Sequence, residues 1–255
     1  MNKPRPWLYW AVLSVLCLLG VSCCKQQQKD PFRYKVAIIG NPSNPDIRYD
    51  ESQMQALKDL GYNTLQLNIA WGARPADEPL NLEDILYVDG IGSRKKADQR
   101  LQTIKERARI AKKWGFRTLF HFGAPRVDSL YKILTPDLID IATEKNSIQK
   151  KEIVDKYVSL LKRLKQEVPE LDDIEVYTFD QDAWVANEFG NGPTDRDIPL
   201  HERIPAFLQA LTGAWAEVSP DGMVWWEPWE ISAGQIYACI PSLPTRNFGM
   251  FLHSN

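Results

Sequence analysis

The feature that most constrains the fold is a regular alternation of short apolar runs with longer amphipathic segments. Apolar, β-branched or aromatic runs recur six times and predict strands at residues 34–40, 64–70, 117–122, 174–179, 223–226 and 247–252. Between them, apolar residues at helical spacing predict helices over 51–60, 98–114, 152–168, 200–218 and 233–240. Strands that alternate with helices in this way favour an α/β fold whose strands run parallel.

The number of these units limits the architecture further. A closed TIM-type (β/α)8 barrel has eight strand-and-helix units, and six are visible in this chain of 255 residues. The sequence therefore predicts a TIM-type (β/α)8 barrel over residues 34–255, with about six units present, as a truncated product or a partial sequence. An open sheet of six strands is the alternative. The connection through Gly92 to the third predicted unit is expected to be an exposed loop.

Residues 1–24 have the pattern of a signal peptide for export. Lys3 and Arg5 precede an apolar stretch at 7–21, which is too short for a comfortable membrane span. Small residues before Cys23 resemble a bacterial lipoprotein signal, in which that cysteine is lipidated; Cys24 is the second candidate, and a plain secretory signal is the alternative. Residues 25–33 are a polar tether. The expected location is the cell envelope, with the membrane reached through an N-terminal lipid anchor.

Composition removes several classes of function. The formal net charge of -2 gives no reason to expect a nucleic-acid partner. The sequence has neither a phosphate-binding glycine loop nor a nucleophile elbow, and no cofactor is expected. A metal site is the competing chemical class, with Asp180, Asp182, His121 and His253 as possible ligands. Because the chain has only 3 His and no clustered cysteines, the expectation is that no metal is bound.

Polar and aromatic residues recur where the predicted strands end. They are Asn68 and Trp71, His121, Asp180 and Asp182, Glu227 and Glu230, and His253 with Asn255. The carboxyl ends of the strands in a β/α barrel face the pocket where substrates bind. These side chains are therefore predicted to converge on one pocket.

The fourth and fifth predicted strands are each followed by a pair of carboxyl groups. Hydrolysis of a glycosidic bond needs two: one protonates the leaving oxygen, and the other is a nucleophile or activates water. Aromatic lining disfavours the charged form of a carboxylic acid, and the aromatic candidates are Trp184, Trp226 and Trp229. Asp182 or Asp180 is the expected general acid, and Glu227 or Glu230 the base or partner. Any single one could instead cap a helix. The residues expected to hold the sugar are Asn68, Trp71, His121, Trp184, Trp229 and His253.

The segments YTFDQDAW at 177–184 and WWEPWE at 225–230 carry a family resemblance. Together with the signal and the strand order, they resemble exported Bacteroidetes-type glycoside hydrolases with (β/α)8 barrels, in the group of α-glucuronidases and hexosaminidase-like enzymes. The resemblance implies a carbohydrate substrate and an acid after the fourth strand, at Asp180 or Asp182, with Glu188 as a weaker candidate. The Asp-Glu dipeptide typical of hexosaminidases is absent at that strand, so acetamido-assisted catalysis is not implied.

Two other interpretations remain open at this level. The chain could be a glycan-binding lipoprotein that keeps the mouth of the barrel without the catalytic machinery. It could also be an inactive barrel fragment, because a barrel that lacks two strands exposes unpaired strand edges.

Overall fold

A computed structural model describes residues 32–39, 48–69, 78–126, 146–178, 198–229 and 231–252. The chain divides into two units, residues 1–33 and 34–255, and all the helices and strands given below belong to the second. The signal peptide, Cys23 and most of the tether lie outside the described residues and stay predictions. Within the ranges given above, no helix is long and apolar enough to cross a membrane.

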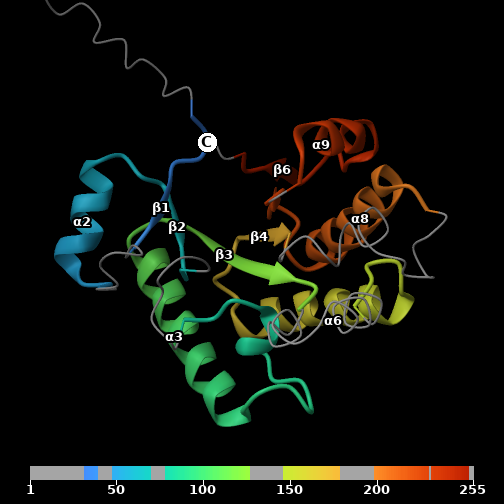
Figure 1. Ribbon diagram of the computed structural model, residues 1–255. Helices are drawn as coiled ribbons and strands as arrows, with labels where there is room; N and C mark the ends of the chain where they lie inside the picture. Colours follow the sequence, from blue (N-terminus) through green and yellow to red (C-terminus); the bar gives the residue numbers. More distant parts are fainter. Residues whose placement is uncertain are drawn as a thin grey trace, which may run out of the picture. The chain divides into compact units, whose positions relative to one another are not determined.

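The second unit is built on one parallel sheet of six strands, which curves into a half-barrel (Figure 1). Each strand pairs with the next one along the chain, in the order β1-β2-β3-β4-β5-β6, and every pair is parallel. The strands are β1 (Val36–Ile38), β2 (Thr64–Gln66), β3 (Arg117–Ala124), β4 (Asp173–Thr178), β5 (Val224–Glu227) and β6 (Phe248–Met250). The predicted α/β class and the six partial-barrel units are confirmed.

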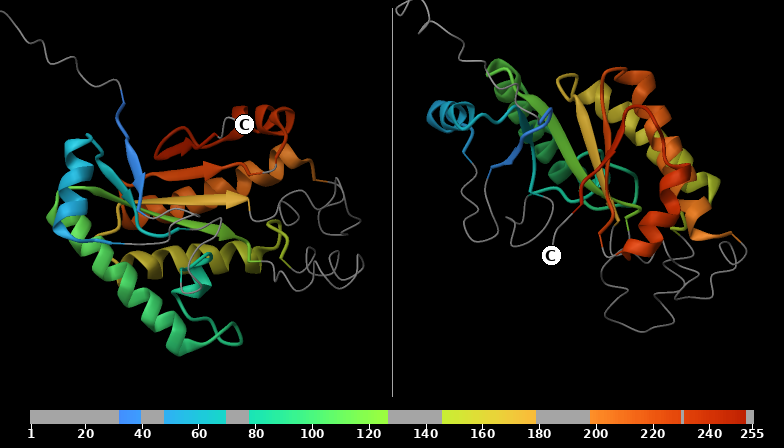
Figure 2. Two further views of the ribbon diagram at one scale, coloured as in Figure 1. Left: turned by 60° about the vertical axis from the view of Figure 1, so that its left-hand side comes forward. Right: turned by 90° about the horizontal axis from the view of Figure 1, so that it is seen from above.

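Helices connect successive strands and run along the outer side of the curved sheet (Figure 2). They are α2 (Glu51–Asp59), α3 (Arg94–Lys113), α6 (Lys151–Glu167), α8 (Leu200–Val218) and α9 (Ala233–Cys239), with short 3-10 turns η1 (Leu82–Asp84) and η2 (Ile240–Ser242). Asp50 caps the start of α2, because its side chain accepts a hydrogen bond from the Gln53 main-chain N–H at 2.8 Å. Gly61 follows α2 with φ +81°, a conformation that favours glycine.

The apolar core lies between the sheet and the helices. Side chains alternate between the two faces of a strand, and those on the helix side of β3, β4 and β5 are Phe120, Phe122, Ile174, Val176, Val224 and Trp226, all fully buried. They belong to the same cluster as Leu161 of α6 and Leu208 and Trp215 of α8. The expectation that Trp226 lines a substrate pocket is therefore wrong, because this side chain belongs to the core.

The connection before α3 also differs from the expected exposed loop. Leu82, Ile85 and Leu86 are completely buried, and η1 forms within this segment. The Asp84 carboxylate accepts hydrogen bonds from the main-chain N–H groups of Leu80 and Asn81, both at 2.9 Å. The segment thus adds a layer to the core and does not lie on the surface.

Candidate functional site

Three ionisable side chains lie on the inner face of the half-barrel, on neighbouring strands. His121 comes from β3, Glu175 from β4 and Glu227 from the last position of β5. In each strand, the residues next to these three in sequence belong to the apolar core. Because side chains alternate between the two faces of a strand, the three ionisable side chains lie on the opposite, inner face. Strand register brings them to similar heights, because His121 is paired with Glu175, and Tyr177 with Glu227. We call these three residues the inner-face cluster.

The inner-face cluster is compact and almost completely buried. The Nε2 atom of His121 lies 2.6 Å from Oε2 of Glu227. One potential ligand atom from each of the three side chains lies within 4.8 Å of the others. The exposed fractions are 1% for His121, 5% for Glu175 and 3% for Glu227. Such burial makes the charge balance of the cluster costly unless each charge is compensated.

Glu175 is the member whose charge is least compensated. Burial is the main cause that raises the pKa of its carboxyl to about 7; the neighbouring His121 acts in the opposite direction, and the Glu227 carboxylate raises it further. The side chain of Glu175 makes no hydrogen bond within the described parts of the chain. A carboxyl in this state can hold a proton near neutral pH.

Asn68 and Tyr177 fix the position of His121. The Asn68 side-chain amide donates to the His121 main-chain carbonyl at 2.8 Å, and its Oδ1 accepts from the His121 main-chain N–H at 3.1 Å. The imidazole stacks on the Tyr177 ring, with centroids 4.8 Å apart and the planes at 29°. His121 is therefore held from its backbone and from one ring face, which limits how far Nε2 can move from Glu227.

A buried ion pair holds the end of β2, from which Asn68 projects. Arg107 of α3 donates from Nη2 to Glu78 Oε1 at 2.5 Å and from Nη1 to the Leu67 carbonyl at 2.7 Å. Glu78 Oε2 in turn accepts from the Ile69 main-chain N–H at 3.1 Å. Arg107 and Glu78 thus bind the main chain on both sides of Asn68, and Asn68 in turn binds the main chain of His121.

Aromatic residues pack beside the inner-face cluster on the same face of the sheet. The ring of Trp225, paired in register with Glu175, lies 4.9 Å from Tyr34 edge-to-face and 5.0 Å from Phe251. The ring also covers Gly249, where an added Cβ would come within 2.3 Å of it. This aromatic group spans the inner face from the segment before β1 to the end of β6.

The described residues include four of the side chains predicted to form the site. Asn68, His121 and Glu227 do converge, whereas Trp229, just beyond β5, is 44% exposed. The side-chain amide of Asn68 donates hydrogen bonds to main-chain carbonyls of the protein itself. His121 was expected near the open end of its strand, but its side chain is buried. The other predicted site residues are Trp71, Asp180, Asp182, Trp184, Glu188, Glu230, His253 and Asn255; they lie outside the described residues and stay predictions.

Glu175 is the residue that the sequence reasoning missed. Its signal was available, because Glu175 is a charged residue between the apolar Ile174 and Val176 of the strand, in the same alternation as Tyr177. A charged residue in the middle of a buried strand needs a partner or a function.

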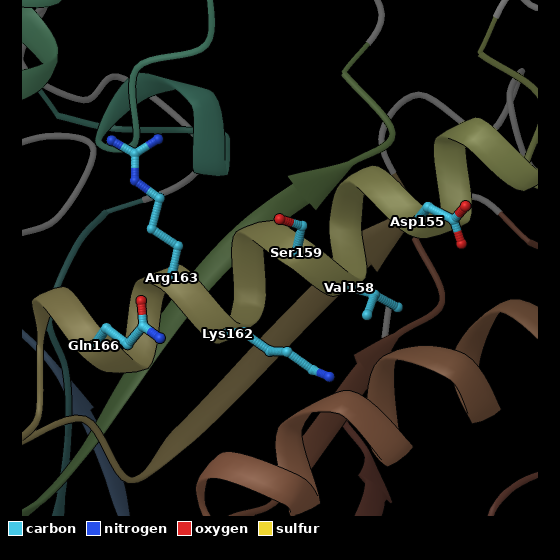
Figure 3. A pocket seen from close by; sticks show the side chains of 6 residues that line it. All are labelled: Asp155, Val158, Ser159, Lys162, Arg163 and Gln166. Atoms are coloured by element: carbon cyan, nitrogen blue, oxygen red, sulfur yellow. The ribbon is translucent and has the colours of Figure 1, made fainter.

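A shallow surface hollow of about 510 Å³ lies elsewhere, on α6. Its lining residues are Asp155, Val158, Ser159, Lys162, Arg163 and Gln166, all from that one helix (Figure 3). Two of them already bind neighbouring elements: Lys162 pairs with Glu217 of α8, and Arg163 donates to the Tyr87 carbonyl. The hollow lies on the helix layer and includes no member of the inner-face cluster, so it gives no support for a substrate pocket.

No protein-family model and no curated protein matches this sequence. Solved structures do match. The O-GlcNAc hydrolase of Thermobaculum terrenum is 15% identical with a TM-score of 0.54, over 88% of this chain and 41% of that one. The β-glycosidase BGL167 is 12% identical (TM-score 0.47; 88% and 66% covered), and endo-glycoceramidase II from Rhodococcus sp. is 14% identical (TM-score 0.47; 86% and 56% covered).

These likenesses concern the fold. At 15% identity, the match to the Thermobaculum hydrolase shows a shared architecture rather than a shared activity. The chain spans about two fifths of the length of that structure. The described strands and helices thus have the fold of a partial TIM barrel of the kind found in glycoside hydrolases.

Proposed function

We propose that this protein is a glycoside hydrolase that cleaves glycosidic bonds of an oligosaccharide or polysaccharide by carboxyl-group catalysis. The observation that carries the proposal is the convergence of Asn68, His121 and Glu227 beside Glu175, on the inner face of a glycosidase-like half-barrel. Polar groups from successive strands meet at this face, and Glu227 is the last residue of β5, at the strand end where barrels of this type bind substrates. The solved structures with a similar fold include glycosidases, which supports the same reaction class.

The two carboxyl roles are assigned as follows. Asp182 or Asp180, after β4, is the general acid that protonates the leaving oxygen. Glu227 or Glu230, after β5, is the second carboxyl, which acts as nucleophile or as the base that activates water. Trp229 is 44% exposed and offers a flat apolar face for a sugar ring.

Hydrolysis of a panel of aryl glycosides and natural oligosaccharides tests this proposal. The panel includes N-acetylglucosaminides, and the assay uses both this chain and the longest protein that its reading frame encodes. Asp182→Asn and Asp180→Asn are compared with Asp89→Asn, whose side chain is 95% exposed. Loss of the true acid should slow unactivated glycosides by about 100-fold or more and spare dinitrophenyl glycosides, whose leaving group needs no proton.

Two results would overturn the proposal. One is the absence of turnover on every glycoside by the longest encoded protein. The other is full activity in both aspartate variants on unactivated substrates. Saturable glycan binding without turnover would instead favour the second candidate function, a glycan-binding lipoprotein, which the exposed Trp229 also suits.

We also propose export and lipid anchoring through Cys23. The support is the sequence pattern of residues 1–24, since these residues lie outside the described part. Metabolic labelling with a fatty acid in a bacterial host should mark the wild-type chain and Cys24→Ser but not Cys23→Ser. Labelling that survives in Cys23→Ser would exclude this cysteine as the anchor.

A further inference from the structure

We infer that His121, Glu175 and Glu227 form a binding site for a divalent transition-metal ion of the zinc or manganese class. The inference goes beyond the proposed hydrolase and does not depend on it. It departs from the sequence expectation of no metal, because that expectation considered His121 only with Asp180, Asp182 and His253.

The donor set suits such an ion. It consists of one imidazole and two carboxylates, on three hydrogen-bonded strands. Imidazole with carboxylate is typical of zinc and other first-row metals, whereas calcium takes six to eight oxygen ligands. Three protein ligands also leave a coordination position open, as catalytic sites require.

The spacing requires only small movements. Ligand atoms roughly 2.1 Å from a tetrahedral metal are about 3.4 Å apart. In the inner-face cluster, Nε2 of His121 and Oε2 of Glu227 are 2.6 Å apart, and the three potential ligand atoms all lie within 4.8 Å. The first separation is shorter than the required value and the upper limit is longer, so the side chains must shift by about 1 Å for the site to form.

A buried side chain in the cluster lacks a hydrogen-bond partner among the described residues, which supports a cation as its partner. Glu175 is only 5% exposed, and its carboxyl makes no hydrogen bond to those residues. Buried polar groups are normally paired. A cation would give the Glu175 carboxylate a partner of opposite charge.

The surroundings also hold the ligands in place. Asn68 binds the His121 main chain on both sides, and Tyr177 stacks on its ring. Metal ligands that are fixed by such neighbours lose less freedom on binding. A metal at this place would make Glu227 a ligand, and the second carboxyl of the proposed hydrolase would then be Glu230.

Metal titration of the full chain tests the inference. The purified protein is stripped with a chelator and titrated calorimetrically with Zn²⁺ and Mn²⁺, with Ca²⁺ and Mg²⁺ in parallel. One Zn²⁺ or Mn²⁺ should bind per chain, and binding should raise the melting temperature. Glu175→Gln should weaken binding by at least about 100-fold. His201→Gln, at an exposed histidine outside the cluster, is the matched control and should bind as the wild type does.

Three results with the same proteins would show that the inner-face cluster is not a metal site. Equal binding by Glu175→Gln and wild type, loss of binding in His201→Gln, or no binding by the stripped wild type would each overturn the inference. Co²⁺ provides a second readout, because its visible spectrum changes when imidazole and carboxylate coordinate it, and circular dichroism confirms that each variant is folded. The assay measures metal binding alone, so its failure leaves the glycoside test untouched, and failure of the glycoside test leaves this assay valid.

Discussion

Arg107 offers the sharpest test of how the fold supports the inner-face cluster. Its guanidinium binds both carboxylate oxygens of Glu78 and the Leu67 carbonyl, and Glu78 binds the Ile69 main-chain N–H. Replacing Arg107 with methionine keeps an apolar stem of similar length but removes the three hydrogen bonds that the guanidinium donates. Glu78 would then remain as a buried carboxylate without its cationic partner.

The burial of the pair sets the size of the effect. The side chains of Arg107 and Glu78 are only 11% and 5% exposed, and removing one partner of a buried ion pair costs about 3–5 kcal/mol. We therefore expect Arg107→Met to lower the free energy of unfolding by about that amount. Arg107→Met with Glu78→Gln should recover most of the loss, because the remaining buried group is neutral and can still accept from Ile69.

Urea unfolding followed by circular dichroism measures these differences. The matched control is Arg109→Met on the same helix, where Arg109 pairs with Glu106 at 2.5 Å but the side chains are 57% and 58% exposed. An exposed pair contributes about 0.2–1 kcal/mol. If Arg107→Met costs no more than Arg109→Met, the ion pair does not hold the end of β2, and the reasoning that connects α3 to Asn68 is wrong.

Two further predictions concern η1 and β6. Burial acts to raise the pKa of Asp84, but hydrogen bonds from the Leu80 and Asn81 amides and from Arg126 outweigh it, so the pKa lies below its ordinary 3.8. The stabilisation from the ionised Asp84 is therefore complete above about pH 5 and lost as the pH falls through the folded-state pKa. Asp84→Asn should lower the free energy of unfolding at pH 7 by about 1.5–3 kcal/mol and make stability depend less on pH in the acid range. An unchanged pH dependence in the acid range would contradict this. Gly249→Ala should cost about 1–3 kcal/mol, because its Cβ meets the Trp225 ring at 2.3 Å. The control, Gly213→Ala in α8, has no atom within 4 Å and should stabilise by about 0.5–1 kcal/mol; equal thermal shifts for the two would refute the steric argument.

The sequence predicted the helices and strands best where apolar residues followed one regular spacing along the whole element. Residues 200–218 were expected to be helical, and α8 has those bounds. In contrast, α3 begins at Arg94, four residues before the expected 98, because its first three residues, Arg94, Lys95 and Lys96, are basic and exposed and show no apolar period. The buried segment at Leu82, Ile85 and Leu86 does have helical spacing, but it is too short to separate from a loop by pattern alone.

The candidate site was predicted in part for a related reason. Alternation along a strand shows which residues share a face, and it could have identified Glu175 beside Tyr177. It does not show which residue of another strand lies opposite. His121 and Glu227 are 106 positions apart in sequence, and their contact follows from how β3, β4 and β5 are aligned. Pairing at this range depends on the register between strands, which also involves contacts between residues far apart in sequence.

Asp173, at the start of β4, explains how that register is fixed. Its carboxylate accepts from Arg117 of β3, at 3.0 Å from Nε and 2.6 Å from Nη2, and from the Met223 main-chain N–H just before β5, at 2.9 Å. One buried side chain thus connects the three strands that carry the inner-face cluster. A slip of one residue in β4 would turn Glu175 towards the apolar core and Val176 towards His121. The contacts of Asp173 oppose that slip, so the residues that align the sheet at one end also determine which side chains meet on its inner face.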